Sequence, residues 1–195
     1  KRLFDIVASL LLLLIFFPIL MLFSISNLYF LGLPIFFTQH RLGRNGLSFR
    51  IIKFKSMVDA KPGESAPDSE RLTKYGKLLR SSSIDELPEL LNVLGGDMSL
   101  IGPRPLPVKY RERFTKEQFR RHTVRPGITG WAQINGRNSI SWPEKFTLDL
   151  WYIDNHSLLL DFKILILTVW RVVERHGVSA KNSATMPEFK GSKDD

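Results

Sequence analysis

The sequence predicts an α+β fold that is mostly helical, with an N-terminal membrane helix, a small β-hairpin and amphipathic helices at a membrane interface. Three observations support this prediction. Residues 3–25 are almost continuously apolar, one Asn-Gly turn separates two short runs with strand character, and most other patterns repeat with the period of a helix. With 195 residues the chain is long enough for one domain with its own core.

The N-terminal segment is long enough to cross a bilayer. Lys1 and Arg2 precede the apolar run of residues 3–25, and about twenty apolar residues span a hydrocarbon core of roughly 30 Å. A signal peptide is the alternative, but the run is long for one and no small-residue cleavage site follows it. The apolar trend continues to residue 37 instead. We therefore expect a membrane anchor.

Two features bear on the topology of this anchor. Pro18 lies in the middle of the run and removes a helical N–H, which predicts a kink there. Lys1 and Arg2 precede the run, and residues 41–55 after it carry five further cations. Because flanks rich in Lys and Arg tend to stay in the cytoplasm, a helix that enters one leaflet and returns satisfies both flanks. The residues alone leave the re-entrant and the spanning topology open.

A β-hairpin is expected over residues 34–57. Residues 34–39 and 49–57 have strand character, and residues 43–46 between them contain Asn-Gly, the strongest short hairpin signal. Residues 60–70 follow as a polar loop with two prolines and a glycine. This loop is either a mobile lid or a plain linker.

Four helices are expected after the hairpin. They cover residues 72–79, a segment that opens at 83–86 and ends at two glycines, an exposed charged segment at 110–122, and residues 161–173. In the last of these, charged residues share one narrow face and nearly all other residues are apolar; these charged residues are Lys163, Arg171, Glu174 and Arg175. This pattern favours a helix in the membrane interface over an ordinary core helix.

Charge and missing motifs narrow the function. The net charge of +9 requires an anionic partner, and the apolar segment favours lipid headgroups or diphosphates over nucleic acid, so we expect no nucleic acid partner. The chain has no cysteine, which excludes disulfides, thiolate zinc sites and a cysteine nucleophile. It also lacks a Walker A loop, a G-x-G-x-x-G fingerprint and a D-x-D triplet, which removes the main support for kinases, dehydrogenases and common metal-dependent glycosyltransferases.

Asp85 and Glu86 form an acidic pair that has two interpretations. Ser83-x-x-Glu86 matches a capping box, and carboxylates in a first helical turn are favoured by the helix dipole. Composition alone favours this capping role. The alternative is catalysis, because an ionised carboxylate can act as a nucleophile or bind a metal.

Arginines on stiff loops favour the catalytic interpretation. Arg104 stands between two prolines in Gly-Pro-Arg-Pro, and residues 125–131 and Arg137 repeat the combination of arginine with glycine and proline. A guanidinium held in this way is preorganised for phosphate. Any one of these loops is more simply a structural turn. Together with an acidic pair and an anchor, they suggest a diphosphate site at the bilayer surface.

Five long segments of the chain resemble the bacterial sugar transferase family, the monotopic phosphoglycosyl transferases. They cover most of residues 1–156, in the family's order, and the short length is similar to the family's minimal catalytic form. The segments are KRLFDIVAS, FFTQHRLGRNGLSFRIIKFKSM, SSSIDELPELLNVLGGDMSLIGPRP, RPGITGWAQINGR and LDLWYIDNHS.

The resemblance implies a domain organisation and a location. Residues 1–33 are a re-entrant membrane helix broken at Pro18, residues 34–178 a catalytic domain with interfacial helices, and residues 179–195 a flexible tail. The catalytic domain lies on the cytoplasmic face of the bacterial inner membrane, and both termini are cytoplasmic.

The resemblance also implies an activity. A sugar 1-phosphate passes from a UDP-sugar to polyprenyl (undecaprenyl) phosphate, through a covalent intermediate on Asp85, with Glu86 as its partner. Asp85 also binds Mg²⁺, the expected cofactor. The cations expected to bind phosphate or substrate are Arg80, Arg104, Arg137, Lys53 and Lys55.

Two other readings remain open at this point. Direct transfer without a covalent intermediate leaves Asp85 as a metal ligand only. A non-catalytic membrane-surface adaptor explains the anchor and the charge but not the acidic pair among the arginine loops. No residue pattern identifies the sugar.

Overall fold

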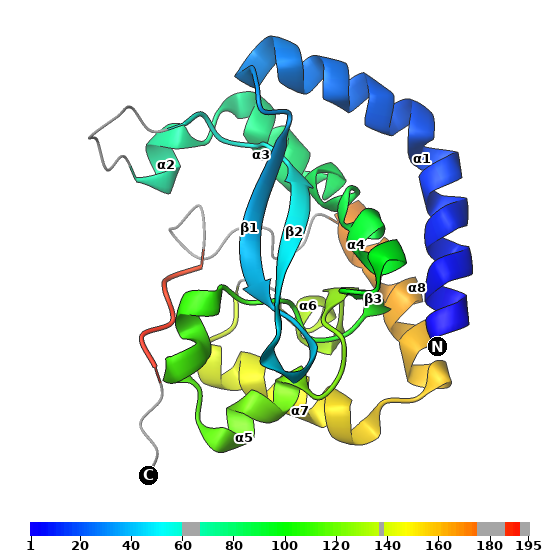
Figure 1. Ribbon diagram of the computed structural model, residues 1–195, viewed down its shortest axis with the longest axis vertical. Helices are drawn as coiled ribbons and strands as arrows, with labels where there is room; N and C mark the ends of the chain where they lie inside the picture. The colour runs from blue at the N-terminus through cyan, green and yellow to red at the C-terminus, as the bar shows by residue number, and fades with distance from the viewer. Residues whose placement is uncertain (60–66, 137–138, 175–185, 192–195) are drawn as a thin grey trace.

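The computed structural model describes residues 1–59, 67–136, 139–174 and 186–191. Helix α1 (Arg2–Leu31) forms a long bent arm along one side and the top of the molecule, and a hairpin of β1 (Phe36–Leu42) and β2 (Ser48–Phe54) runs through the middle (Figure 1). Helices and a second pair of short strands pack around this hairpin. The prediction of a mostly helical α+β fold is confirmed.

The burial pattern of helix α1 is the reverse of that of a helix in a soluble protein. Its three buried residues are polar, namely Asp5, Ser9 and Asn27. Its apolar side chains point outward instead, and Leu14 is 74% exposed. It is also the one described helix that is long and apolar enough to cross a membrane. Polar residues turned toward the protein and apolar residues turned away are typical of a helix solvated by lipid.

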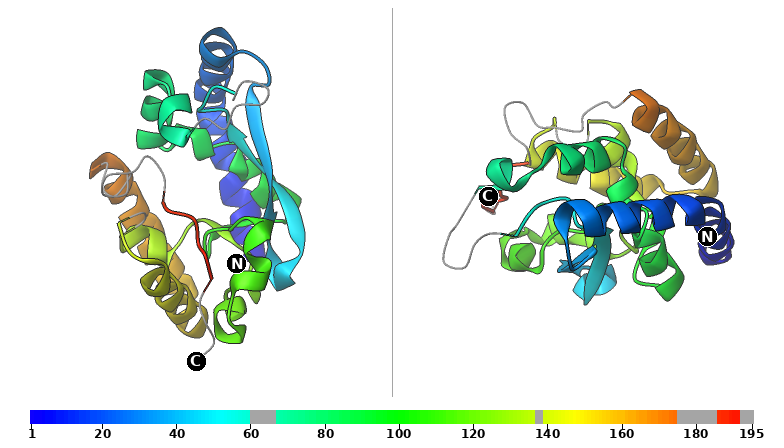
Figure 2. Two further views of the ribbon diagram at one scale, coloured as in Figure 1. Left: turned by 90° about the vertical axis from the view of Figure 1, so that its left-hand side faces the viewer. Right: turned by 90° about the horizontal axis from the view of Figure 1, so that it is seen from above.

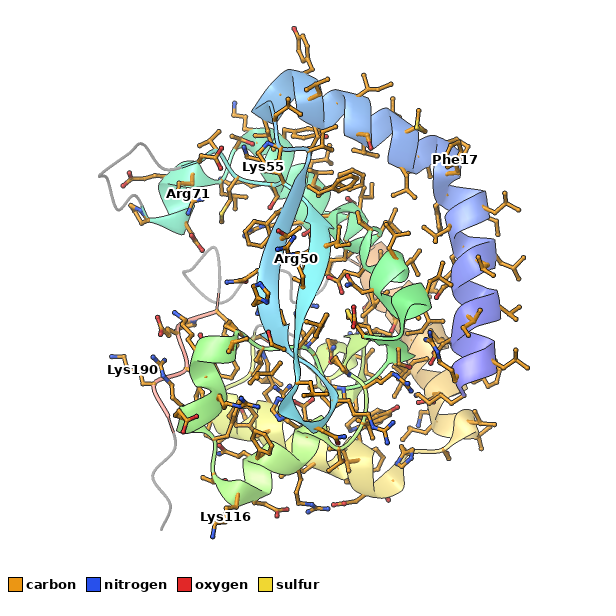
Figure 3. The ribbon with its side chains drawn as sticks, in the orientation of Figure 1. Phe17, Arg50, Lys55, Arg71, Lys116 and Lys190 are labelled. Atoms are coloured by element: carbon orange, nitrogen blue, oxygen red, sulfur yellow. The ribbon has the colours of Figure 1, made fainter. Side chains whose placement is uncertain are left out.

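The predicted kink in α1 is present. The helix continues through Pro18, and Figure 1 shows it bending sharply in its middle, where Figure 3 places Phe17 at the corner. Proline lacks the N–H that the preceding turn would bind, and its ring pushes against that turn. The bend therefore follows from one residue.

The β-hairpin was correctly predicted, with strands displaced by about two residues. β1 and β2 are antiparallel, with Phe36 opposite Phe54 and Leu42 opposite Ser48. The turn between them is a short 3₁₀ helix, η1 (Arg44–Gly46), in which Asn45 and Gly46 have φ of 56° and 74°. These left-handed conformations explain the Asn-Gly pair.

The helix expected to open at residues 83–86 is in fact two elements, and the capping-box prediction is wrong. After α2 (Asp68–Arg71) and α3 (Lys74–Ser81), a single 3₁₀ turn, η2 (Ile84–Glu86), precedes α4 (Glu89–Gly95). Ser83 has a φ of 57° and its side chain does not cap η2. The acidic pair thus lies on a 3₁₀ turn and not in the first turn of an α-helix. The predicted end of the helix is confirmed, because Gly96 terminates α4 with φ of 94°.

A short parallel pair of strands was not predicted. β3 (Ser99–Ile101) lies beside β4 (Gly127–Thr129). The two backbones approach so closely that a Cβ on Gly127 would lie 2.1 Å from the Gly102 nitrogen. The glycines of these loops are therefore required by backbone packing, which explains them without a bound anion.

The prediction of an exposed helix over residues 110–122 is wrong. The chain there forms three short pieces, and Arg121 and His122 are buried. The break occurs at Phe114, because Thr115 caps a new helix through a capping box with Gln118. The pieces are η3 (Val108–Arg113), α5 (Lys116–Phe119) and η4 (Arg120–His122).

Three helices complete the domain: α6 (Trp131–Ile134), α7 (Trp142–Asn155) and α8 (Leu158–Glu174). The predicted helix over residues 161–173 is confirmed as α8. One of its faces packs inward through Ile164, while Ile166, Val169 and Trp170 are exposed. This outward apolar face agrees with the interfacial helix expected from the sequence.

One described part of the predicted C-terminal tail packs against the rest of the protein. Residues 186–191 of this tail are described, and Phe189 is buried at 3% exposure. It packs into an aromatic cluster with Tyr110 and Phe146. The apolar side chain at position 189 thus fixes a segment whose composition is otherwise polar.

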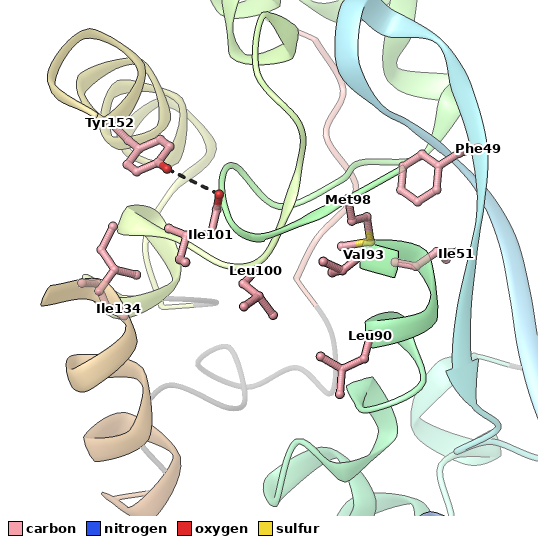
Figure 4. Packing of buried hydrophobic residues seen from close by; sticks show 10 residues of the cluster. Phe49, Ile51, Leu90, Val93, Met98, Leu100, Ile101, Ile134 and Tyr152 are labelled. Atoms are coloured by element: carbon pink, nitrogen blue, oxygen red, sulfur yellow. Dashed lines mark hydrogen bonds between the residues drawn. The ribbon is translucent and has the colours of Figure 1, made fainter. Parts of the chain in front are cut away.

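The main core joins β2 and α4, which flank the turn η2 that carries the acidic pair. It includes Phe49 and Ile51 from β2, Leu90 and Val93 from α4, and Tyr152 from α7 (Figure 4). The Tyr152 hydroxyl donates to the Ile101 carbonyl oxygen at 3.4 Å. This packing holds β2, α4 and β3 in fixed relation.

Candidate active site

Glu86 is held by two cations from different elements. Lys53 on β2 donates from Nζ to Oε1 at 3.0 Å. Arg104, in the loop after β3, pairs through Nη2 with the same oxygen and through Nη1 with Oε2 at 3.4 Å. This carboxylate raises the pKa of Arg104, so the guanidinium stays charged. Arg104 and Glu86, both predicted site residues, are thus in direct contact.

Glu89 was missed by the sequence reasoning. It lies on the first turn of α4 at 1% exposure, and its Oε1 is 2.8 Å from Lys53 Nζ. Burial raises the pKa of Glu89 to about 7, against the opposing effect of Lys53. Lys53 therefore bridges two carboxylates. The three-residue spacing from Glu86 was visible, but helix capping and solvation explain such a spacing equally well.

Asp85 is buried, and its carboxylate has no partner among the described residues. Its side chain makes no hydrogen bond or ion pair with any residue that the structure describes. Burial is the main cause that raises the pKa of Asp85 to about 6, followed by the charge of Glu86. Three cations lower it again: Lys53, Arg80 and Arg104. Successive side chains on a 3₁₀ turn point about 120° apart, so Asp85 and Glu86 face different surroundings.

The other predicted cations have different positions. Arg80 on α3 lies within electrostatic reach of Asp85 and donates from Nε to the Ser56 hydroxyl at 3.0 Å, and its burial lowers its pKa. Lys55 does not join this group: its Nζ is 2.6 Å from Asp59 and 3.4 Å from the Leu31 carbonyl oxygen. Figure 3 shows Lys55 near the C-terminal end of α1. Arg137 lies outside the described residues, as does most of the predicted loop at 60–70.

Arg41 is a further cation that the sequence reasoning did not select. It is close enough to Arg104, Glu86 and Glu89 to interact electrostatically with all three, and its Nη1 donates to the Pro105 carbonyl oxygen at 3.3 Å. Burial, followed by Arg104, lowers the pKa of Arg41 to about 10. Its place in a strand gave no sign that it would face the acidic pair.

A cavity of about 460 Å³ adjoins the acidic pair. Glu86 and Arg104 line one part of it, and α1 and α8 contribute apolar walls. Asp85 is not among the residues that line it. Glu86 therefore borders an apolar space that Asp85 does not, while Lys53 and Arg104 lie close to both carboxylates.

A magnesium ion at the acidic pair would need substrate oxygens as additional ligands. Among the described residues, no three His, Cys, Asp or Glu side chains group as metal ligands. Mg²⁺ in phosphate-handling sites is commonly held by one or two carboxylates together with substrate phosphate oxygens. Asp85, whose carboxylate is uncommitted, fits that mode.

The acidic pair lies among basic side chains, beside an apolar cavity whose walls include the long apolar helix α1. The model of the bacterial sugar transferase family matches residues 1–175. The chain belongs to this family and is an enzyme, a sugar transferase.

Three relatives illustrate the similarity. The uncharacterised sugar transferase EpsL of Bacillus subtilis (strain 168) is 52% identical over 197 residues, which cover 100% of this chain and 97% of that protein. Galactosyl transferase CpsE of Streptococcus agalactiae serotype III (strain NEM316) is 42% identical over 87% of this chain, and the UDP-glucose:undecaprenyl-phosphate glucose-1-phosphate transferase of Klebsiella pneumoniae is 42% identical over 88%. The matches cover only 41% and 39% of these last two proteins.

Proposed function

We propose that the protein transfers a sugar 1-phosphate from a UDP-sugar to undecaprenyl phosphate, the first membrane step in the assembly of a glycoconjugate. An Asp85 carboxylate oxygen attacks the β-phosphorus, the bond to the UMP oxygen breaks, and UMP leaves. An oxygen of the lipid phosphate then attacks the same phosphorus and displaces Asp85. The product is a polyprenyl diphosphate sugar, and Asp85 is regenerated as a carboxylate.

The contrast between the two carboxylates carries this proposal. Glu86 is engaged by Lys53 and Arg104, whereas Asp85 makes no ion pair with the described residues. A nucleophile must be able to bring its oxygen into bonding distance of phosphorus. The Glu86 carboxylate could do so only by breaking its ion pairs with Lys53 and Arg104. Glu86 is better suited to hold Arg104 in place as a positioning residue.

The cations around Asp85 address the repulsion between a carboxylate and a diphosphate. Lys53, Arg80 and Arg104 all favour the ionised form of Asp85. They can also stabilise the charge that develops on the phosphoryl oxygens. Asp85 together with substrate phosphate oxygens would hold Mg²⁺, which neutralises diphosphate charge when bound.

Both ends of α1 are fastened to the same body, which supports the re-entrant topology. At the start of the helix, Arg2 donates to the carbonyl oxygens of Val93 and Leu94. Near its end, Asn27 donates to the carbonyl oxygens of Ile35 and Lys55 at 2.8 and 3.0 Å. A helix bent at Pro18 and tied at both ends enters and leaves the bilayer on one face. We propose that this is the cytoplasmic face and that both termini lie there.

The covalent step is tested by intact mass measurement of the protein incubated with Mg²⁺ and a UDP-sugar, without lipid. Glucose and galactose occur in the names of relatives, so the panel begins with UDP-glucose and UDP-galactose. We expect a phosphosugar adduct in the wild type and in Glu86→Gln, and none in Asp85→Asn. Turnover with lipid but no adduct, together with ternary-complex kinetics, would instead favour direct displacement with Asp85 as a metal ligand. Absence of both adduct and turnover would contradict the proposed transfer of these two sugar phosphates.

The topology is tested with cysteines, because the chain has none of its own. One cysteine is added ahead of Lys1, and another replaces Tyr29, which is 83% exposed near the other end of α1. In the re-entrant arrangement a membrane-impermeant thiol reagent labels both from the cytoplasmic side only. Labelling of the two from opposite sides would show that α1 spans the bilayer.

A further inference from the structure

The cavity beside Glu86 has one wall made by the membrane helix. Leu12, Phe16 and Ile19 of α1 face it, spaced by four and three residues along one side of the helix. Neighbouring α1 residues point away from it, and Ile15 is 65% exposed. The same helix thus presents one apolar stripe to the lipid and a second to the cavity.

Helix α8 forms the opposite wall in the same manner. Leu165 and Val172 line the cavity, while Ile166 and Val169 on the outer side are exposed. The cavity is therefore bordered by two helices whose outer faces are apolar. A hydrocarbon chain entering between them would exchange one apolar surrounding for another, so its entry carries no cost of exposure to water.

The polar side chains of the cavity favour a bound molecule that carries a charged group at one end. Glu86 and Arg104 lie at the catalytic side, and Arg171 of α8 is a second cation on the lining. Gln133 also lines it, and neither its amide nitrogen nor its amide oxygen has a hydrogen-bond partner among the described residues. An unpartnered buried amide is costly, so this one favours an occupant that brings a polar group.

A sugar nucleotide fits this space poorly. Its hydroxyls would face leucine, isoleucine, valine and phenylalanine side chains, and burial of a hydroxyl without a hydrogen-bond partner is unfavourable. An isoprenoid chain with a terminal phosphate matches both the apolar and the charged parts of the cavity lining. Its hydrocarbon matches α1 and α8, and its phosphate matches the guanidinium of Arg104.

We propose that this cavity receives the phosphate-proximal isoprene units of the polyprenyl phosphate acceptor, with its phosphate directed to Arg104. The assignment rests on the proposed transfer reaction and adds to it the location of the acceptor. The lipid approaches from the side of Glu86, which lines the cavity, and its phosphate meets the phosphosugar carried by the neighbouring Asp85.

The test narrows the cavity and compares the kinetics for the two substrates. Val172→Trp fills the α8 wall, and Val169→Trp places the same side chain on the outer face of that helix, three residues away. Ile19→Trp and Leu22→Trp form a second matched pair on α1, since Ile19 lines the cavity and Leu22 is exposed. Thermal unfolding in detergent checks that each variant is folded.

For Val172→Trp and Ile19→Trp we expect a KM for undecaprenyl phosphate at least tenfold higher than in the wild type, with the KM for the UDP-sugar unchanged. The outer variants should match the wild type for both substrates. An unchanged acceptor KM in both folded cavity variants, or a raised KM for the UDP-sugar alone, would overturn the assignment. Because the wild type is assayed in parallel, a failure of the transfer reaction itself is seen separately, as absence of wild-type turnover.

A short competitor distinguishes an isoprenoid site from a simple phosphate site. Farnesyl phosphate should compete with the acceptor in the wild type and at least tenfold less well in Val172→Trp. Inorganic phosphate at the same concentration should not compete. Equal inhibition by inorganic phosphate and farnesyl phosphate would mean that the apolar walls contribute nothing to binding, and the proposal would be wrong.

Discussion

The carboxylate of Asp5, in the first turn of the membrane helix, accepts a bifurcated hydrogen bond from the hydroxyl of Ser99, whose oxygen lies 3.0 and 2.9 Å from the two carboxylate oxygens. It also accepts one from the Leu100 N–H at 3.2 Å. Both Asp5 and Ser99 are buried at 1% exposure. Ser99 begins β3, and the loop after β3 carries Arg104, which holds Glu86. The anchor and the acidic pair are therefore joined by one short strand.

Replacement of Asp5 by alanine should weaken both the fold and the reaction. The Ser99 hydroxyl and the Leu100 N–H would be left buried without an acceptor, which costs about 1–3 kcal/mol for each unsatisfied group. We expect a lower Tm in detergent and a lower kcat, because β3 and Arg104 lose their fixed position. Ser26→Ala is the control, since that hydroxyl donates to the Leu22 carbonyl oxygen on the exposed surface of the same helix. A Tm equal to that of the wild type would show that Asp5 does not hold β3.

A buried ion pair supports Arg104 from the other side. Arg121 Nη2 lies 2.6 Å from Asp149 Oδ2 and donates to the Arg104 carbonyl oxygen at 2.8 Å. Both charged side chains are 2% exposed. Asp149→Ala leaves the guanidinium of Arg121 buried without a counter-ion, so we expect a loss of about 3–5 kcal/mol in the free energy of unfolding.

Helix α7 provides the matched control for this loss. Asp154 pairs with Arg120, but both side chains are largely exposed, at 50% and 42%. Exposed pairs contribute little, so Asp154→Ala should leave the Tm nearly unchanged. Chemical unfolding of the two variants side by side measures the difference. Equal effects of the two substitutions would mean that burial of the Arg121 pair is not what stabilises this region.

His122 should make the fold sensitive to acid. Its ring is buried against Phe114 and Phe119, and burial lowers its pKa from 6.5 to about 4. The unfolded chain then binds more protons than the folded one between these values, so the contribution of His122 is complete above about pH 6.5 and is lost as the pH falls toward 4. The shift corresponds to about 3 kcal/mol at most.

The Tm difference between the wild type and a His122 variant isolates this effect. Asp85 and Glu89 also titrate, but their pKa values are raised, so their contribution to stability changes with pH in the opposite direction and is common to both proteins. His122→Gln cannot titrate, so the Tm difference between wild type and this variant should shrink as the pH is lowered from 6.5 to 4. A constant difference for His122→Gln would contradict a buried neutral imidazole.

Removal of Mg²⁺ should abolish turnover and leave the fold intact. The described residues contain no cluster of three candidate ligands, so the ion we propose is held partly by the substrate and does not act as a structural metal. With a chelator we expect no turnover, an unchanged Tm, and recovery of activity when Mg²⁺ is restored in excess. Full turnover in the chelator would exclude the ion from the reaction, and a lower Tm would indicate a structural site.

Local signals in the sequence predicted the parts of the fold that depend on few residues. Pro18 was sufficient for the bend of α1, and Asn45 with Gly46 for the hairpin turn. Long-range packing was not predictable in this way. The pairing of β3 with β4 depends on two backbones that approach at Gly102 and Gly127, and no pattern within either segment indicates its partner.

In the candidate site, too, residues in recognisable local segments were predicted, and residues brought in by long-range packing were not. Asp85, Glu86 and Arg104 were selected because they lie in recognisable segments, and the structure places them together. Glu89 and Arg41 were missed, since only the tertiary arrangement brings Lys53 to Glu89 and Arg41 to Arg104. Lys55 belongs to the attachment of α1 instead, because it lies just after the end of β2, where the chain runs beside the C-terminal end of α1.

The C-terminal segment gives the last prediction, because composition and structure disagree about it. Composition predicts a flexible tail, whose loss should not matter, whereas Phe189 fills the aromatic cluster of Tyr110, Phe114 and Phe146. Deletion of such a ring costs about 3–5 kcal/mol, so Phe189→Ala should lower the Tm clearly. Lys190→Ala, at an exposed neighbour, should not. If both variants melt with the wild type, the segment is a tail and the cluster is complete without it.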